Sequence, residues 1–247
     1  GIPDTLAALF YLPALIFYVR FRREGGRRLL ALSLACFALS LLCKETPIVL
    51  PLVVAAWELL FCEKGSLSAS AKAAASRALP FFGVGPAYML ARVAVLGRVG
   101  WGHPAMADVP AASTLLTAPR ALVGYLQHLV APFNLSLVYD VPLARGLADA
   151  RFVVPVLILS GLALALWLLR HRLRREHLFA LVLLFAPLAP VLNLRVFHYD
   201  YLVQDRYLYL PSVGFCLLAA LAWTRLSRAR RTAAFAAAGL LFVSFGA

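Results

Sequence analysis

Two apolar runs joined by a short charged turn occupy residues 29–61. This stretch reads LLALSLACFALSLLCKETPIVLPLVVAAWELLF, in which Lys44-Glu45-Thr46-Pro47 interrupts about thirty apolar residues. Apolar runs approaching the ~20 residues that a helix needs to cross a bilayer are typical of membrane segments. The stretch therefore predicts a helical hairpin in a membrane, with a tight turn at the water interface.

The composition of the whole chain is that of a membrane protein. Of its 247 residues, 63% are hydrophobic and 14% charged, and the mean hydropathy is +0.84. This apolar content exceeds that of soluble domains. We predict an all-α fold, a polytopic membrane helix bundle with about eight transmembrane helices and one interfacial helix, forming a single transmembrane domain over residues 1–247. The expected spans are 4–20, 29–43, 47–61, 80–97, 152–169, 178–194, 208–225 and 232–246.

The net charge of +13 alternates along the chain. Basic residues concentrate in every second predicted loop, at residues 20–28, 64–77, 170–175 and 225–231. In the intervening loops, acidic residues roughly match the basic ones. Since cytoplasmic loops carry an excess of lysine and arginine, we predict that the basic loops are cytoplasmic and the others extracytoplasmic. The charge is then a topology signal, and we expect no nucleic-acid partner.

The longest predicted loop, residues 98–151, contains an amphipathic segment. Arg120, Gln127 and His128 recur at helical spacing, and leucines and valines fill the other face. This pattern predicts a helix that lies in the membrane surface and ends before Pro132. The sequence leaves open whether the loop covers a donor or recognises an acceptor.

The cysteines and histidines do not show the spacing of a metal site. Cys36, Cys43, Cys62 and Cys216 lie within or at the ends of apolar spans, where disulfides are not expected. No phosphate-binding glycine loop, dinucleotide turn or nucleophile elbow occurs in the sequence. We expect no metal and no other cofactor.

Two charged features lie at predicted extracytoplasmic ends of spans. In the first, Lys44-Glu45, the charges either mark the water interface or have a function. In the functional interpretation, Lys44 attracts an anion and Glu45 holds the Lys44 side chain in place. The second is Arg92, about one helical turn inside the outer end of its span. It either snorkels to the surface or meets an anion or carboxylate in the interior.

A third charged feature is the stretch from Asn193 to Ser212, where Asp205-Arg206 lie among tyrosines. An aromatic belt at the interface explains a tyrosine such as Tyr209 without any function. It does not explain an acid beside a base, which are costly near hydrocarbon unless they are paired, hydrated or bound to a ligand. Because arginine can bind two phosphate oxygens at once and a carboxylate can position it, the pair suits a phosphate-bearing ligand.

Together, the three features suit a lipid carrier whose phosphate lies at head-group depth. We predict that Lys44, Arg92 and Arg206 bind this phosphate and stabilise the charge that develops on it as a sugar departs. The predicted site-organising residues are Glu45, Asp205, Tyr207 and His198. We also expect Lys44, Asp205 and Arg206 to converge within reach of one phosphate.

Four motifs resemble, in order, those of a known family. They are Leu6-Ala-Ala-Leu-Phe10; Leu41-Leu-Cys-Lys44-Glu45 running into Ile48-Val-Leu-Pro51; Tyr125-Leu followed by Ala131-Pro132-Phe-Asn-Leu135; and Asp205-Arg-Tyr-Leu-Tyr-Leu-Pro-Ser-Val-Gly-Phe-Cys216. They resemble the multispanning part of the transmembrane and tetratricopeptide-repeat O-mannosyltransferases and their bacterial relatives, over nearly the whole chain. Family members usually have Glu-Arg at Asp205-Arg206, so the carboxylate arm here is one methylene shorter.

The resemblance implies a GT-C type glycosyltransferase, a multi-pass enzyme of a bacterial inner membrane that acts on the extracytoplasmic side. Its donor would be a polyprenyl-phosphate sugar, mannose by default, and its acceptor a protein or glycan. The family's catalytic acidic pair lies in the first extracytoplasmic loop, so the catalytic residues are expected upstream of Gly1. Tetratricopeptide repeats would follow the membrane part. We expect this chain to be a fragment that supplies the carrier-phosphate-binding part and is inactive alone.

Two other classes of protein remain open. A multispanning transporter would also have many spans and buried charges, but it would be expected to show paired half-sequences, and no internal symmetry is visible. A non-catalytic membrane subunit would need no charged cluster.

Overall fold

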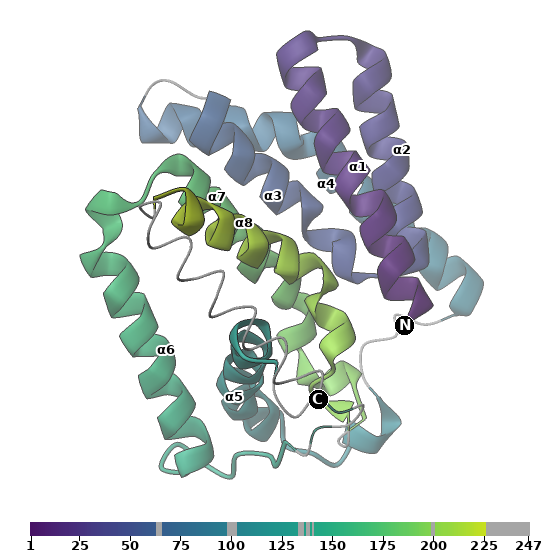
Figure 1. The fold of residues 1–247 in the computed structure, drawn as a ribbon. Helices are drawn as coiled ribbons and strands as arrows, with labels where there is room; N and C mark the ends of the chain where they lie inside the picture. The colour runs from purple at the N-terminus through teal and green to yellow at the C-terminus, as the bar shows by residue number, and fades with distance from the viewer. Residues whose placement is uncertain are drawn as a thin grey trace, which may run out of the picture.

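In the computed structural model, every regular element of the described residues is helical. The structure describes residues 1–62, 66–97, 103–132, 136, 139, 141–198 and 201–225. Figure 1 shows the helices as a bundle, with α1, α2, α3 and α4 grouped on one side and α5, α6, α7 and α8 on the other. The predicted all-α fold is confirmed for this part of the chain.

The first two helices form a hairpin. α1 (Ile2–Glu24) and α2 (Arg27–Cys43) are joined by two glycines, Gly25 and Gly26, at φ 78° and 92°. Glycine adopts these positive φ angles without the clash of a Cβ atom. Two serine hydroxyls of α2 donate hydrogen bonds to backbone carbonyl oxygens of α1, from Ser33 at 2.6 Å and Ser40 at 2.7 Å. Such small polar side chains let membrane helices pack closely.

After the Lys44-Glu45 turn, the chain runs back through three consecutive helical pieces. They are the 3₁₀ helix η1 (Thr46–Val49), α3 (Leu50–Trp57) and the π-helical turn η2 (Glu58–Cys62). The next helix, α4 (Leu67–Leu96), is 30 residues long. It joins the predicted span 80–97 to the residues that precede this span as one continuous helix. The alanine-rich start of α4 favours this uninterrupted helix, because alanine is the strongest helix former.

The long loop contains η3 (Pro104–Met106) and the predicted amphipathic helix, α5 (Ala111–Val130). α5 ends before Pro132, as predicted. Its buried side chains, Thr114, Thr117, Ala121 and Tyr125, follow one helical stripe. Ala121 and Tyr125 belong to a core cluster that includes Leu188. One face of α5 is therefore packed against protein, and its placement in a membrane surface stays a prediction.

Helix α6 (Ala150–Leu168), which comes after the long loop, has one buried residue, Pro155. It is followed by the short 3₁₀ helix η4 (Arg170–Arg172). Most large apolar side chains of α6 are exposed, as a helix in contact with lipid would require. These exposed side chains are Val154, Leu157, Ile158, Leu162, Leu164, Trp167 and Leu168.

The last two long helices, α7 (Arg175–Phe185) and α8 (Tyr209–Arg225), pack against each other. A Cβ atom added to Gly214 of α8 would lie 2.4 Å from the backbone nitrogen of Leu184 in α7. Between these helices, the chain forms short 3₁₀ turns. Those described are η5 (Ala186–Leu188), η6 (Pro190–Leu192), η7 (Leu194–Val196) and η9 (Asp205–Leu208).

Five helical segments in the described part of the chain are long and apolar enough to cross a membrane. They are 2–24, 68–95, 150–168, 175–192 and 205–224. Of the eight predicted spans, 29–43 is the 17-residue α2, and 47–61 falls in the shorter apolar helix Thr46–Cys62. The eighth, 232–246, lies outside the described residues. The chain is thus a helical membrane protein by length and composition, and the number eight stays a prediction.

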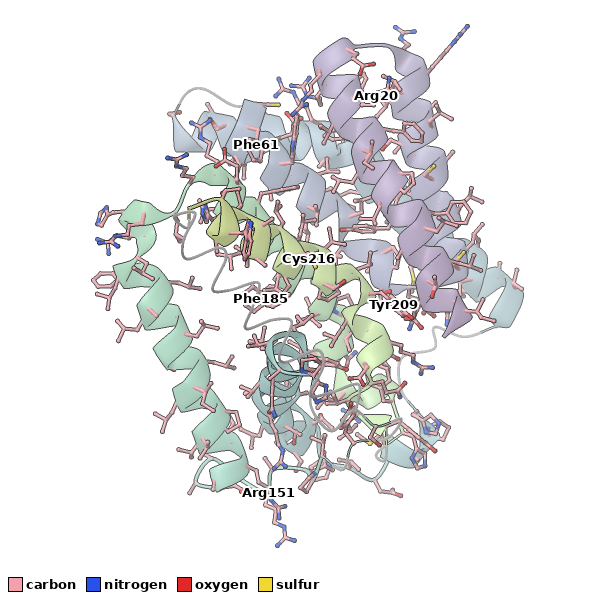
Figure 2. The ribbon with its side chains drawn as sticks, in the orientation of Figure 1. Arg20, Phe61, Arg151, Phe185, Tyr209 and Cys216 are labelled. Carbon is pink, nitrogen blue, oxygen red and sulfur yellow. The ribbon has the colours of Figure 1, made fainter. Side chains whose placement is uncertain are left out.

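The bundle has two chemically different ends. Arg20, near the turn between α1 and α2, and Arg151, at the start of α6, lie at opposite ends in Figure 2. We call the end where α1 turns into α2 the Arg20 end, and the end where α1 begins and α2 stops at Cys43 the Lys44 end. Ion pairs join α1 and α4 to Glu58 at the Arg20 end. Lys44 pairs with α1, and Glu45 with α4, at the other end. Each of these ion pairs joins residues that the charge alternation predicts to lie on the same side of the membrane.

Candidate anion-binding site

Lys44 is paired with a carboxylate that the sequence analysis did not identify. Its ammonium forms an ion pair with the carboxylate of Asp4, near the start of α1, and lies 4.0 Å from the centroid of the Tyr207 ring. The side chains of Lys44 and Asp4 are only 15% and 7% exposed. Burial lowers the pKa of Lys44, and the ion pair with Asp4 opposes that shift. Within the structure, the charge of Lys44 is therefore balanced by Asp4.

A small pocket lies beside this ion pair. It is lined by Asp4, Thr46, Pro187, Arg206, Tyr207, Tyr209 and Leu210. Its volume of about 10 Å³ is room for about one water molecule. A phosphate oxygen can enter a space of this size, while the bulk of a larger ligand would stay outside.

Arg206 supplies the uncompensated charge of the pocket. Its side chain is exposed, and its guanidinium carbon lies 5.4 Å from the centroid of the Tyr207 ring. Among the residues that the structure describes, no carboxylate lies within 4.0 Å of the Arg206 guanidinium. Because Asp4 and Lys44 balance each other, the pocket has a net positive charge and is suited to an anion.

Arg92 and Glu45 form a separate ion pair. The Arg92 guanidinium contacts the Glu45 carboxylate and donates a hydrogen bond of 2.9 Å to the Tyr88 hydroxyl. Neither residue lines the pocket. Arg92 thus meets a carboxylate, but not in the protein interior, since the side chain of Glu45 is 48% exposed. The expectation that Glu45 is the ion-pair partner of Lys44 is wrong, because Asp4 takes that place.

Asp205 faces away from the pocket, toward α5. Its Oδ1 lies 2.8 Å from Nδ1 of His128, and its Oδ2 accepts a hydrogen bond of 2.6 Å from the Tyr139 hydroxyl. Asp205 therefore does not position Arg206. The expected convergence of Lys44, Asp205 and Arg206 around one phosphate is not what the structure shows. Side chains of consecutive residues in a 3₁₀ turn point about 120° apart, which explains the separation.

The surroundings of Asp205 form a compact polar cluster. The rings of His128 and Tyr139 lie 4.5 Å apart between centroids. Burial raises the pKa of Tyr139, and its hydrogen bond to Asp205 raises it further. Nearby, the Tyr125 hydroxyl accepts a hydrogen bond of 3.4 Å from the backbone nitrogen of Gln204. α5 thus contacts the residues that precede α8 through the side chains of Tyr125 and His128.

Of the other predicted site-organising residues, one lies at the pocket and one does not. Tyr207 lines the pocket, and the centroid of its ring lies 4.0 Å from Nζ of Lys44 and 5.4 Å from the guanidinium carbon of Arg206. His198 instead packs beside His103, with 5.1 Å between ring centroids, and beside Tyr201. His198 does not line the pocket.

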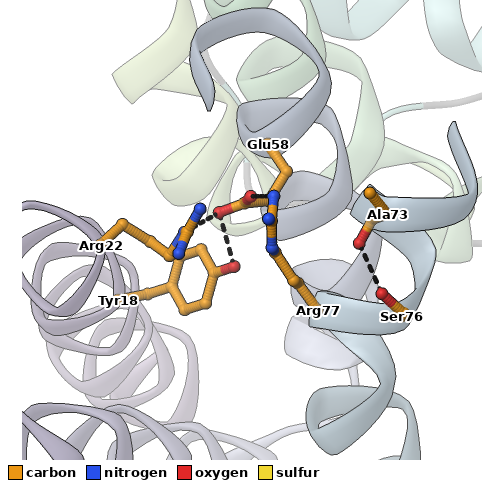
Figure 3. Close-up of polar contacts among 6 residues, drawn as sticks. All are labelled: Tyr18, Arg22, Glu58, Ala73, Ser76 and Arg77. Carbon is orange, nitrogen blue, oxygen red and sulfur yellow. Dashed lines mark hydrogen bonds and ion pairs between the residues drawn. The ribbon is translucent and has the colours of Figure 1, made fainter. Parts of the chain in front are cut away.

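The most buried acid of the described chain, Glu58, also escaped the sequence analysis. Its side chain is fully buried at the Arg20 end, where Figure 3 shows three side chains converging on it. Tyr18 donates a hydrogen bond of 2.8 Å, Arg22 one of 2.6 Å and Arg77 one of 3.0 Å. A single acid inside the apolar run 47–61 was a signal that could have found it, since isolated charges in such runs need partners.

Comparisons with family models, with curated proteins and with solved structures found no match to this chain.

Proposed function

We propose that this chain is the carrier-binding part of a membrane glycosyltransferase. Such an enzyme moves a sugar, mannose by default, from a polyprenyl phosphate to an acceptor, which we take to be a protein. The observation that carries the proposal is Arg206, an exposed cation without a carboxylate partner among the described residues, at a pocket whose other charges cancel. The motif resemblance points in the same direction.

The lining of the pocket suits a ligand with a charged head and an apolar tail. Among the lining residues, Arg206 and Thr46 offer hydrogen-bond donors, and Pro187 and Leu210 are apolar. When the bond between sugar and phosphate breaks, the phosphate gains negative charge. A guanidinium fixed beside it stabilises that charge more in the transition state than in the bound donor, which accelerates transfer.

The proposed sidedness follows from the basic loops. The Arg20 end carries the arginine-rich turns, so we place it in the cytoplasm. The Lys44 end then faces the extracytoplasmic side of a bacterial inner membrane, where a flipped lipid-linked donor and a secreted acceptor would meet.

Binding of a polyprenyl phosphate to the full-length protein in lipid nanodiscs tests this function. Arg206→Ala should weaken binding by about 10- to 100-fold, the range for a lost charge-assisted hydrogen bond. Sugar transfer from a polyprenyl-phosphate sugar should fall at least as much. The matched control is Arg145→Ala, which removes an exposed arginine that does not line the pocket. Equal affinity of the wild type and Arg206→Ala would sink the proposal.

A further inference from the structure

The ion pair between Lys44 and Asp4 places a carboxylate where an anionic ligand would be expected. Asp4 lines the pocket, whereas Lys44 does not, and the Lys44 ammonium pairs with the Asp4 carboxylate. Both side chains are largely buried. Because an unpaired buried ammonium is costly, Lys44 needs an anionic partner. A ligand that takes Lys44 from Asp4 must therefore bring a negative charge of its own.

Lys44 and Arg206 lie near the same aromatic ring. Nζ of Lys44 is 4.0 Å from the centroid of the Tyr207 ring, and the guanidinium carbon of Arg206 is 5.4 Å from it. Burial lowers the pKa of Lys44, the ion pair with Asp4 opposes that shift, and the charge of Arg206 adds to the lowering. The two cations are thus close enough to repel each other, and a nearby anion offsets this repulsion. In the empty site, Asp4 is that anion.

The pocket is too small for a whole phosphate group while Asp4 stays in place. Its volume is room for about one water molecule, or one phosphate oxygen. A phosphate that entered beside the Asp4 carboxylate would also bring two negative charges together, which repel strongly at short range. The short side chain of Asp4 can leave Lys44 by rotation about its own bonds, without a movement of α1. Its departure would enlarge the pocket and open it to Lys44.

We propose that Asp4 is an internal substitute for the carrier phosphate, which replaces it as the partner of Lys44; this inference rests on the proposed glycosyltransferase function. In the bound state, Lys44 and Arg206 both contact the phosphate, and Asp4 no longer pairs with Lys44. The polyprenyl phosphate released after transfer is a phosphate monoester with about 1.5 to 2 negative charges, which two cations balance better than one. The exchange also keeps Lys44 paired in both states.

Binding of polyprenyl phosphate to the full-length protein in lipid nanodiscs tests this exchange. Asp4→Asn removes the competing charge and nearly keeps the shape, so it should bind about 10-fold more tightly than the wild type, or better. The double variant Asp4→Asn/Lys44→Gln should lose that gain, because Lys44 is then absent. Asp108→Asn removes an exposed acid that does not line the pocket, and this matched control should bind like the wild type.

Thermal unfolding with and without polyprenyl phosphate provides a second measurement. Asp4→Asn should destabilise the empty protein, because it removes one partner of a buried ion pair. A phosphate that takes the place of Asp4 restores a partner to Lys44. Polyprenyl phosphate should therefore raise the unfolding midpoint of Asp4→Asn more than that of the wild type. Equal increases in both proteins would overturn the exchange.

The outcomes separate this inference from the function on which it rests. A wild type that binds polyprenyl phosphate, with Asp4→Asn binding no more tightly, would overturn the exchange and leave the proposed function intact. A double variant that binds as tightly as Asp4→Asn would also overturn it, since Lys44 would then make no contact with the phosphate. A wild type that binds no polyprenyl phosphate would remove the proposed function itself.

Discussion

Replacing Glu58 by alanine should destabilise the protein strongly. In the wild type, the buried carboxylate accepts hydrogen bonds from Tyr18, Arg22 and Arg77. Glu58→Ala leaves two guanidinium groups facing each other and a buried phenol hydroxyl without its acceptor. The two arginine side chains are 25% and 39% exposed, so water can partly replace the lost partner.

The size of this loss follows from the burial of Glu58. Removing one partner of a buried ion pair destabilises a protein by about 3–5 kcal/mol. Because the arginines can be partly rehydrated, we expect the lower end, about 3 kcal/mol. For a chain of this size, that corresponds to a fall of about 6–12 °C in the unfolding midpoint. Glu58→Gln keeps the shape and one acceptor oxygen, and should lie between the wild type and Glu58→Ala.

Thermal unfolding in detergent, followed by the fluorescence of a thiol-reactive dye, measures the effect. Glu24→Ala is the matched control, because it also breaks a glutamate–arginine pair of α1, but one in which both side chains are 52% exposed. Exposed pairs contribute little, so this variant should unfold like the wild type. Equal midpoints for Glu58→Ala and Glu24→Ala would refute the reasoning that burial makes the Glu58 cluster a major source of stability.

Three further predictions concern packing, the pocket and the hydrogen bond between Tyr139 and Asp205. Gly214→Ala should destabilise the protein by about 1–3 kcal/mol, because the new Cβ would meet the α7 backbone at 2.4 Å. Gly161→Ala is the control and should be tolerated, because nothing lies within 4 Å of the added Cβ. Equal thermal unfolding midpoints for the two variants would contradict the packing of α8 against α7. Arg92→Ala should leave polyprenyl-phosphate affinity within about threefold of the wild type, since Arg92 is paired with Glu45 and does not line the pocket. A loss of affinity as large as that of Arg206→Ala would show that Arg92 takes part in phosphate binding. An ultraviolet difference titration of the wild type against Tyr139→Phe should show that Tyr139 ionises above its ordinary pKa of 10.0, because burial and the hydrogen bond to Asp205 favour the neutral phenol. Ionisation of Tyr139 at or below that value would contradict its hydrogen bond to Asp205.

The sequence was most informative where local chemistry decides the structure. The Lys44-Glu45 turn falls between α2, which ends at Cys43, and η1, which begins at Thr46. The long-loop helix ends before Pro132, because proline breaks a helix. An acid–base pair among tyrosines near an apolar span predicted a site at residues 205–207, and the structure places Arg206 and Tyr207 in the lining of the pocket.

What the sequence could not show depends on contacts between distant residues. Glu58 is bonded to Arg22 and Arg77, which are 36 and 19 residues away along the chain. The pairing of Lys44 with Asp4 in place of Glu45 depends on how α1 packs against α2. The separation of Asp205 from Arg206 depends on side-chain directions in a 3₁₀ turn, which adjacency in the sequence does not reveal.

The most direct test of the phosphate site is a structure of the full-length protein with a bound polyprenyl phosphate. The phosphate should lie within hydrogen-bond distance of the Arg206 guanidinium, beside Tyr207, with the polyprenyl tail leaving past Pro187 and Leu210. A phosphate bound elsewhere, with the Arg206 guanidinium making no contact to it, would contradict the account.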